Sequence, residues 1–449
     1  MKEFNFEKLP IVEIANEIII DAVNKGASDI HFDPSKDSLK IRFRIDGILS
    51  DYSIVPSKYK RNMISRIKMI AGMNIMETRL PQDGAIKSKI GDRLLDLRVS
   101  TLPTNNAEKI VIRILDYSMS LAGLDNLGFS KDAMEKINKL IRIPNGIILV
   151  TGATGTGKST TLYSILQKLN TEEVNIITVE DPVEMDIAGI NQVQTQTEIG
   201  LTFATILRSI LRQDPNIIMI GEIRDDETAR IAVRASITGH LVLSTLHTNN
   251  SLNTIERLTD MDVERYLLGS SLEGIISQRL ARKLCPNCMI KRQTTEYEKQ
   301  VFKTVIGKDI NEMYVANKEG CPRCNHGYRG RLAILEVLIM NEKIKDAITN
   351  NAPKHVLRDL VYTGEVVTLL QDGLNKVVEG ETSFEEILKI VDLENDMTAY
   401  KDDNLVANLK MAQKAHSIKE TPKQPTPQIT QQVQQINNQI PNNVETVEF

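Results

Sequence analysis

The sequence predicts an α/β protein whose main part is a parallel sheet with helices on both faces. Apolar, β-branched segments alternate with helical segments between residues 146 and 248, which is typical of strands joined by crossover helices. A shorter region before them combines a helical pattern with alternating strands, and two Cys-X-X-Cys pairs follow them. We therefore expect a central α/β core, a small α+β domain before it and a cysteine-containing element after it.

Composition places the chain among ordinary globular proteins. Its 449 residues are 41% hydrophobic and 25% charged, which suffices for two or three domains. The 55 Lys and Arg residues nearly balance the 59 Asp and Glu residues, so no strong field favours nucleic acid or anionic lipid as the main partner. The sequence has no apolar run of about 18 residues and no secretory signal at its start. A cytoplasmic location is expected, with any membrane attachment made through protein contacts.

The first 116 residues are expected to form the small α+β domain, of PAS-like type. Residues 10–23 have apolar positions at helical spacing, whereas 39–49 and 93–102 alternate as strands do. The apolar run 109–115 closes the domain. Small and polar residues predict a linker over 117–130.

The second domain begins at about Lys131 and alternates strands with helices. The predicted strands cover residues 146–152, 175–181, 216–222 and 240–248, and the predicted helices cover 160–169, 203–213 and 228–236. Strands at this spacing pair in parallel, because each helix returns the chain to the same edge of the sheet.

A glycine-rich segment lies where the first core strand meets the first core helix. It matches the pattern Gly-X4-Gly-Lys-Ser from Gly152 to Ser159. Glycines let backbone N–H groups close around phosphates, while Lys158 reaches the β and γ phosphates and Ser159 ligates Mg²⁺. The expected ATP-binding residues are Gly152, Ala153, Thr154, Gly155, Thr156, Gly157, Lys158, Ser159 and Thr160. The segment predicts a RecA-like P-loop ATPase core rather than a chance glycine-rich turn.

Two glutamates end apolar strands after this loop. Ligands of open parallel sheets lie outside the carboxyl ends of the strands, so Glu180 and Glu222 can both face the γ-phosphate. Glu180 follows the first strand after the P-loop helix and is predicted to activate water. Glu222 has the later Walker B position and is predicted to hold Mg²⁺. The two roles could be exchanged, and the alternative is that both are solvated carboxylates at strand ends.

Two histidines, His240 and His247, flank one apolar strand. They are an odd number of positions apart and cannot share one face of a straight strand, so we expect them at its two ends. The functional hypothesis is phosphate sensing or an interface role. The alternative is a purely structural role, and only geometry distinguishes the two.

Four cysteines form two pairs able to hold one tetrahedral Zn²⁺. They are Cys285, Cys288, Cys321 and Cys324. In a reducing compartment paired Cys-X-X-Cys motifs favour a metal over disulfides, and a zinc–thiolate site of this kind is structural. His326 could replace one ligand. The alternative is four unligated buried thiols.

The predicted parts follow one another without an internal repeat. They are the N-terminal α+β domain (1–116), the linker (117–130), the RecA-like ATPase core (131–281), a tetracysteine zinc element (282–330), a C-terminal helical subdomain (331–396) and a disordered tail (397–449). The tail is rich in Gln, Asn and Pro and cannot bury enough apolar surface to offset the entropy of ordering.

The ordered motifs resemble those of the secretion ATPases of type II secretion and type IV pilus systems, a family that includes competence pseudopilus ATPases. The motifs are ASDIHFDP, RIDG, RLPQDG, GATGTGKST, VEDPVE, LRSILRQDPNIIMIGEIRD, TGHLVLSTLHTN and the two cysteine pairs, over roughly residues 8–395. The resemblance implies a cytoplasmic homohexamer at the inner membrane. It also implies that hydrolysis rotates domains and acts on a platform protein of that membrane, which assembles pilin or pseudopilin subunits. No specific nucleic-acid partner is expected.

The resemblance also implies arginines that act in trans from the N-terminal domain. Arg98 and Arg113 are the candidates, because an arginine can neutralise charge at the γ-phosphate. The alternative is that both belong to the solvated face of a strand. A tetracysteine element is frequent in the extension ATPases of this family and absent from its retraction ATPases.

The sequence departs from the family pattern in three places. Ala85 follows the LPQDG motif where arginine is common, which removes one expected contact between subunits. Asn216 replaces the usual aspartate, with little expected effect. The chain begins at the second N-terminal domain of the family, without the long region by which many extension ATPases bind the platform.

Three other functions compete with an assembly motor. A retraction ATPase is disfavoured by the cysteine element. A nucleic-acid translocase with a zinc finger predicts DNA-stimulated hydrolysis and a basic channel, for which the near-neutral charge gives no support. A nucleotide-binding scaffold without turnover requires that Glu180 and Glu222 lie away from the γ-phosphate.

Overall fold

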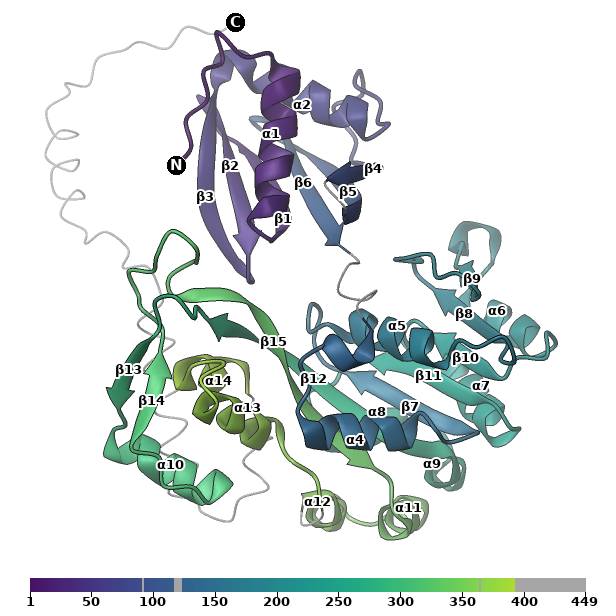
Figure 1. Ribbon diagram of the computed structural model, residues 1–449. Helices are drawn as coiled ribbons and strands as arrows, with labels where there is room; N and C mark the ends of the chain where they lie inside the picture. Colours follow the sequence, from purple (N-terminus) through teal and green to yellow (C-terminus); the bar gives the residue numbers. More distant parts are fainter. Residues whose placement is uncertain (91–92, 117–122, 363–364, 392–449) are drawn as a thin grey trace, which may run out of the picture. The chain divides into compact units, whose positions relative to one another are not determined.

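The computed structural model describes residues 1–90, 93–116, 123–362 and 365–391 (Figure 1). Within these ranges the strands form a six-stranded sheet, a seven-stranded sheet and a two-stranded sheet. The predicted α/β class is confirmed, with an α+β domain before the core. The first residues of the expected linker and the whole of the expected disordered tail lie outside the described residues.

The N-terminal domain is an antiparallel sheet with two helices packed on it (Figure 1). The sheet order is β3-β2-β1-β6-β5-β4. Its elements are α1 (Ile11–Asn24), β1 (Ala27–Pro34), β2 (Ser38–Ile45), β3 (Ile48–Pro56), α2 (Ser57–Ile70), β4 (Gln82–Ile90), β5 (Arg93–Thr104) and β6 (Ala107–Asp116).

The turn between β2 and β3 shows how sequence sets this sheet. Asp46 and Gly47 have φ angles of 49° and 84°, so both central residues of the turn are left-handed. A two-residue hairpin loop of this type matches the twist of its strands, and Asp-Gly is a preferred sequence for it. Alternate residues of β2, such as Ile41 and Phe43, are then buried against the helices.

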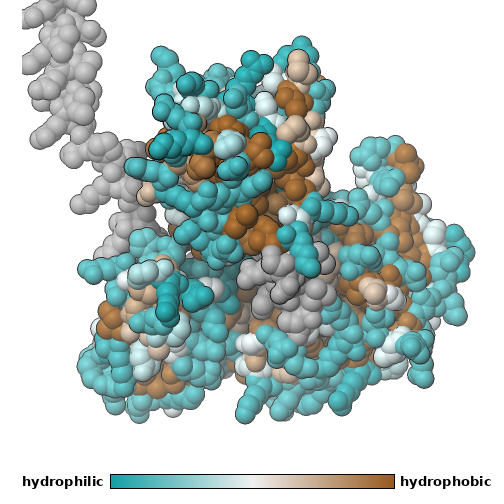
Figure 2. Space-filling model, turned by 45° about the horizontal axis from the view of Figure 1, so that its top comes forward, coloured by the Kyte–Doolittle hydropathy of each residue, from teal (hydrophilic) through white to brown (hydrophobic). Residues whose placement is uncertain are grey.

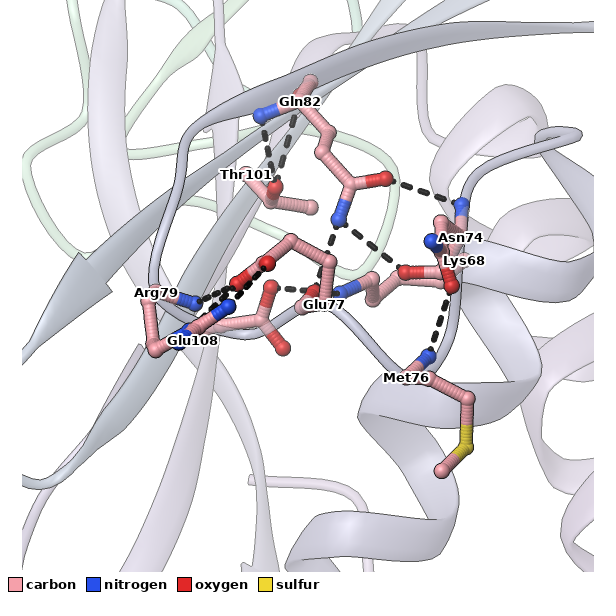
Figure 3. A network of polar contacts seen from close by, with 8 residues as sticks. All are labelled: Lys68, Asn74, Met76, Glu77, Arg79, Gln82, Thr101 and Glu108. Atoms are coloured by element: carbon pink, nitrogen blue, oxygen red, sulfur yellow. Dashed lines mark hydrogen bonds and ion pairs between the residues drawn. The ribbon is translucent and has the colours of Figure 1, made fainter.

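A buried ion pair fixes the loop between α2 and β4 (Figure 3). The Lys68 ammonium lies 2.6 Å from Glu108, both side chains are at most 5% exposed, and Lys68 also donates to the Glu77 carbonyl at 2.6 Å. The Gln82 side chain, in the RLPQDG motif, bonds to the backbone of Asn74 and Glu77. The loop is therefore held by side chains that bond to its backbone.

Most of the large hydrophobic side chains that are exposed in the described residues lie in this domain. Figure 2 shows brown, apolar atoms gathered in the upper part of the picture, which is also where the N-terminal domain is drawn in Figure 1. Met76 is 87% exposed and Leu80 is 60% exposed, and both belong to the loop held by Gln82. Apolar surface of this kind is typical of interaction surfaces.

The core is a seven-stranded sheet of order β15-β12-β7-β11-β10-β8-β9, parallel except for β15 (Figure 1). Its strands are β7 (Gly146–Thr151), β8 (Ile176–Glu180), β9 (Asn191–Gln194), β10 (Ile217–Ile220), β11 (Leu241–Leu246), β12 (Leu272–Leu284) and β15 (Tyr328–Ile339). Its helices are α4 (Lys131–Leu140), α5 (Lys158–Leu169), α6 (Phe203–Ile210), α7 (Asp226–Ile237), α8 (Ser251–Asp260) and α9 (Arg265–Ser271), and two short 3-10 helices cover Leu124–Asn126 and Thr197–Ile199.

Both faces of this sheet are buried, as the apolar strands predict. Ile147 and Leu149 of β7 pack in one cluster with α6, α7 and α8, whereas Ile148 and Val150 pack in a second cluster with α4 and α5. Successive residues of a strand point to opposite faces, so a strand covered on both sides is apolar throughout. The four strands predicted for the core and its three helices are confirmed.

The chain after the predicted core strands contains four strands that the sequence analysis missed. β12 and β15 extend the core sheet, and β13 (Ile290–Gln293) pairs with β14 (Glu312–Val315). The remaining helices are α10 (Glu296–Ile306), α11 (Glu342–Thr349), α12 (Lys354–Tyr362), α13 (Leu369–Val378) and α14 (Phe384–Ile390). No helix in the described ranges combines the length and apolar character needed to cross a bilayer.

Candidate nucleotide-binding and metal sites

The glycine-rich loop joins β7 to α5 at the carboxyl edge of the core sheet. The Lys158 side chain folds back over it and donates to the carbonyls of Gly152 and Ala153 at 2.8 and 3.0 Å. Lys158 is only 8% exposed, and burial lowers its pKa, while the nearby charge of Glu222 opposes that shift. A buried ammonium held by carbonyls alone is ready to bind an anion.

Other residues of the loop are accessible to a ligand. The exposed ones are Ala153, Thr154, Gly155 and Ser159, whereas Thr160 is half-buried and Thr156 is buried. Thr156 donates to the Ala153 carbonyl at 3.0 Å and so closes the loop on itself. Gly157, with φ of 88°, precedes the first residue of α5, where backbone N–H groups and the helix dipole favour phosphate.

Glu180 lies at the end of β8, as predicted, but its carboxylate is already occupied. Thr178 donates to Oε1 at 2.5 Å, Gln192 donates to Oε1 at 3.0 Å, and Tyr163 donates to Oε2. The side chain is 3% exposed. This arrangement is that of a carboxylate that holds β8, β9 and α5 together.

Glu184, four residues later in the same acidic segment, has a different environment. Its Oε2 lies 3.3 Å from Arg98 Nη2 and has no hydrogen-bond partner among the described residues. Burial raises the pKa of Glu184, against the opposing charges of Arg98 and Arg113. Tyr163 connects the two glutamates, because its hydroxyl donates to Glu180 and accepts from the Glu184 N–H at 3.1 Å. Sequence reasoning missed Glu184, which does not end a strand.

Glu222 and His247 come together at the carboxyl edge. Glu222 Oε2 lies 3.3 Å from His247 Nε2, and Glu222 Oε1 pairs with Arg224. Although burial raises the pKa of Glu222, the hydrogen bond and charge of Arg224 outweigh it, and the pKa lies below its usual value. Arg224 also reaches Asp181 at 3.3 Å and so links the strand ends of β10 and β8. The charge of Glu222 also acts on Lys158, whose pKa it raises against the effect of burial.

His240 lies at the other end of β11, so the two histidines are at opposite ends of one strand, as predicted. Its Nδ1 is 2.8 Å from the Ala235 carbonyl and 3.3 Å from the Thr238 hydroxyl, at the end of α7. A six-residue strand spans about 20 Å, so His240 is remote from the phosphate loop of its own chain. The structure brings only His247 to that loop.

Arg98 and Arg113 lie opposite each other on neighbouring strands of the N-terminal sheet. Arg113 pairs with Asp29 at 3.3 Å and is 66% exposed. Arg98 donates to the Val183 carbonyl at 3.2 Å and meets Glu184, so it contacts the acidic segment of its own chain. Both arginines point from the same face of the sheet, because directly paired residues share a face.

The four cysteines form one compact cluster. Their Sγ atoms all lie within 4.8 Å of one another, with Cys285 and Cys321 separated by 3.8 Å and Cys288 and Cys324 by 3.6 Å. A tetrahedral zinc ion with Zn–S bonds of about 2.3 Å places its thiolates about 3.8 Å apart, so the cluster fits zinc. His326 turns away, with Nδ1 3.2 Å from the Lys318 carbonyl.

Comparisons with known proteins agree with this geometry. A family model described as type II/IV secretion system protein matches residues 5–389. The chain is 44% identical over 382 residues to type II secretion system ATPase E of Vibrio cholerae, covering 85% of the chain and 75% of the relative. It is 45% identical over 381 residues to the type IV pilus assembly ATPase PilB of Myxococcus xanthus, covering 84% and 67%.

A solved structure shares the fold over most of the chain. The pilus retraction motor PilT with bound ADP superposes with a TM-score of 0.57 at 26% identity, covering 88% of this chain and 98% of PilT. The predicted RecA-like P-loop ATPase core with its preceding domain is therefore confirmed.

Proposed function

Because the chain belongs to the type II/IV secretion system protein family and is an ATP hydrolase, we propose that it is a motor for fibre assembly. The fibre is a type II secretion pseudopilus, a type IV pilus or a competence pseudopilus. The observation that carries the proposal is the environment of Lys158. This lysine is buried in the glycine-rich loop, its ammonium donates to backbone carbonyls rather than to a carboxylate, and the charge of Glu222 acts on it. The motor is a homohexamer at the cytoplasmic side of the inner membrane and acts on a platform protein there.

The residues of the carboxyl edge divide the chemistry among them. The loop from Gly152 to Thr160 binds the phosphates, and Lys158 turns from its carbonyl partners to the β and γ oxygens. Ser159 and Glu222 would hold Mg²⁺, which would supply positive charge at the phosphates. His247 orients Glu222 through their 3.3 Å contact.

One carboxylate of the acidic segment activates the attacking water. The hydrogen bonding supports Glu184 over Glu180, because both oxygens of Glu180 already accept hydrogen bonds. A raised pKa brings Glu184 nearer to the range in which a carboxylate accepts a proton efficiently. Arg98 and Arg113 supply positive charge from the N-terminal sheet.

Contacts between subunits are supported by the apolar surface of the N-terminal domain. Met76 and Leu80 project from a loop that Gln82 and the Lys68–Glu108 pair hold in place. A fixed apolar loop is suited to permanent contact with a second copy of the chain, whereas a monomer in water gains nothing from it.

The cysteine cluster supports an assembly role over retraction. Cys285, Cys288, Cys321 and Cys324 fit a structural zinc ion, and the resemblance associates such an element with extension ATPases. Retraction is the second candidate, since PilT shares the fold. A deletion strain that loses fibres supports assembly, and one with excess fibres supports retraction.

The direct test measures ATP hydrolysis and particle mass together. We expect the purified chain to form a hexamer-sized species whose hydrolysis the cytoplasmic domain of the platform protein accelerates. Lys158→Ala should abolish hydrolysis. A monomer stimulated only by DNA would contradict the motor and support a translocase.

A further inference from the structure

Gln278, in the middle of β12, contacts the side of the phosphate loop that faces β12. Its side chain is 2% exposed. The amide Nε2 donates to the Thr156 carbonyl at 2.8 Å, and Oε1 accepts from the Thr161 hydroxyl at 2.8 Å. One buried amide thus bridges the end of the loop and the first turn of α5. Both lie more than a hundred residues before Gln278 in the sequence.

Both glycines that define the loop motif pack against this residue. A Cβ atom added to Gly152, whose φ is 151°, would lie 2.6 Å from the Gln278 carbonyl oxygen. One added to Gly157 would lie 2.8 Å from Gln278 Nε2. Real Cβ contacts are longer, so the two glycines permit a close fit of the loop on β12 as well as the approach of phosphate.

β12 is a rigid support for this contact. It pairs in parallel with β7, with Ser277 opposite Thr151, the last residue before the loop. On its other side it pairs with β15. Gln278 itself pairs with Leu335 of β15 and directly follows the part of β12 that is bonded on both sides, so its backbone is held in place.

We propose that Gln278 is a positioning residue for nucleotide binding, which rests on the function proposed above. The peptide bond between Thr156 and Gly157 is planar and trans, so its carbonyl and its N–H point in opposite directions. Because Gln278 holds the Thr156 carbonyl against β12, the Gly157 N–H points away from β12 and into the loop. Gln278 therefore sets the direction of a backbone donor to the phosphates.

The test measures the affinity of the full chain for Mg²⁺-ADP and for a non-hydrolysable Mg²⁺-ATP analogue. Gln278→Met keeps the volume but removes both the donor to Thr156 and the acceptor from Thr161. We expect both affinities to fall roughly tenfold through loss of the Thr156 bond, since a hydrogen bond contributes about 1 to 1.5 kcal/mol and 1.4 kcal/mol is tenfold. KM for ATP should rise by a similar factor, with kcat changed less than about twofold.

Gln278→Glu gives a response that a purely structural role would not. An ionised carboxylate repels the Thr156 carbonyl, whereas a protonated carboxyl donates to it as the amide does. We therefore expect weak binding at alkaline pH and recovery as the pH is lowered. Thr161→Val leaves the Thr156 bond in place and should change affinity less than about twofold.

Controls separate this inference from folding and from the function itself. Gln167→Glu makes the same charge change further along α5 and should leave affinity unchanged. Melting temperatures without nucleotide identify variants that fail to fold. Normal affinity in folded Gln278→Met and Gln278→Glu, with Lys158→Ala inactive, would overturn the inference alone. Nucleotide binding and hydrolysis unaffected by Lys158→Ala would contradict the proposed function.

Discussion

Buried lysines in the N-terminal domain and in the nucleotide loop differ in what surrounds their charge. Lys68 is 1% exposed and lies 2.6 Å from Glu108, so its charge is neutralised within the chain. Lys158 is 8% exposed and forms no ion pair with any carboxylate of the described residues. A buried charge is costly unless it is paired, so an anionic ligand at the loop would supply the partner that Lys158 lacks. The two buried lysines thus differ in whether the chain itself completes their pairing.

The buried lysines of the remaining chain behave like Lys68. Lys136 lies 2.8 Å from Asp132, and Lys376 lies 3.3 Å from Asp372. Each belongs to the same helix as its partner and forms part of the packing of that helix. Among the lysines classed as buried in the described ranges, Lys158 alone lacks such a partner.

Lys158→Met tests the comparison with the largest expected effect. Hydrolysis should become undetectable, because the phosphates lose their buried cation. Without nucleotide the variant should be at least as stable as the parent in urea denaturation, because an unpaired buried charge has been replaced by an apolar chain of similar length. A variant much less stable than the parent would show that Lys158 has a structural role like that of Lys68.

Removal of metal tests a second incomplete group, the four thiols. We expect one zinc ion per chain, and a strong chelator should unfold the segment between Cys285 and Cys324 locally, since structural zinc contributes on the order of 10 kcal/mol of apparent folding free energy. Metal analysis and limited proteolysis before and after chelation measure this. An element that stays protease-resistant when stripped of metal would mean that packing alone holds it.

Lys68→Met tests the complete pair. It leaves Glu108 buried without a partner, and we expect the free energy of unfolding to fall by about 3 to 5 kcal/mol. The double variant Lys68→Met, Glu108→Leu should recover much of that loss, and hydrolysis per folded molecule should stay near the parent value. A single variant as stable as the parent would break the comparison.

The two glutamates of the acidic segment also differ in how completely they are paired. Both oxygens of Glu180 accept hydrogen bonds, whereas Glu184 Oε2 accepts none from the described residues. Glu184→Gln should lower kcat about a hundredfold or more with little change in melting temperature, because a general base is removed. Glu180→Gln is the matched control and should mainly lower the melting temperature, because it alters the bonds from Tyr163, Thr178 and Gln192. The opposite result would restore Glu180 as the base.

A pH series gives the smallest effect. The pKa of Lys158 in the folded chain lies below the ordinary value of 10.5, so the unfolded chain binds more protons between these two values. Stability relative to Lys158→Met should therefore rise with pH in that window, by at most about 1.4 kcal/mol per pH unit. Urea denaturation of the nucleotide-free chain at several alkaline pH values measures this slope.

Much of the core could be predicted because its signals are local. Strands such as β7 and β11 are short apolar runs with glycine or histidine at their ends, and the loop motif fixes where strand meets helix. β12 was missed because Gly274 and several charged residues interrupt its apolar pattern. That strand is recognisable only from its partners β7 and β15.

The site was predicted less completely, because the environment of each candidate residue depends on contacts with residues far away in the sequence. Glu180 ends a strand and so fits the sequence pattern of a catalytic carboxylate. In the structure, however, its oxygens accept hydrogen bonds from Tyr163 and Gln192, which belong to other elements. Gln278 has no motif of its own. Its importance is visible only from its hydrogen bond to Thr156, which lies in the connection between β7 and α5. Local patterns identify groups that can react, and three-dimensional contacts decide which of them are free to do so.

The length of β12 also governs how the molecule comes apart. The strand runs for 13 residues from the core, past the phosphate loop, and ends next to Cys285. Because β7 pairs with Leu272–Ser277 and β15 with Gly274–Leu284, the amide protons in the doubly paired part of β12 should exchange with solvent only on global opening, whereas those between the cysteine pairs should exchange through a separate, smaller opening. We then expect the element that carries the four cysteines to open and close as a separate cooperative unit while β12 stays paired in the core sheet.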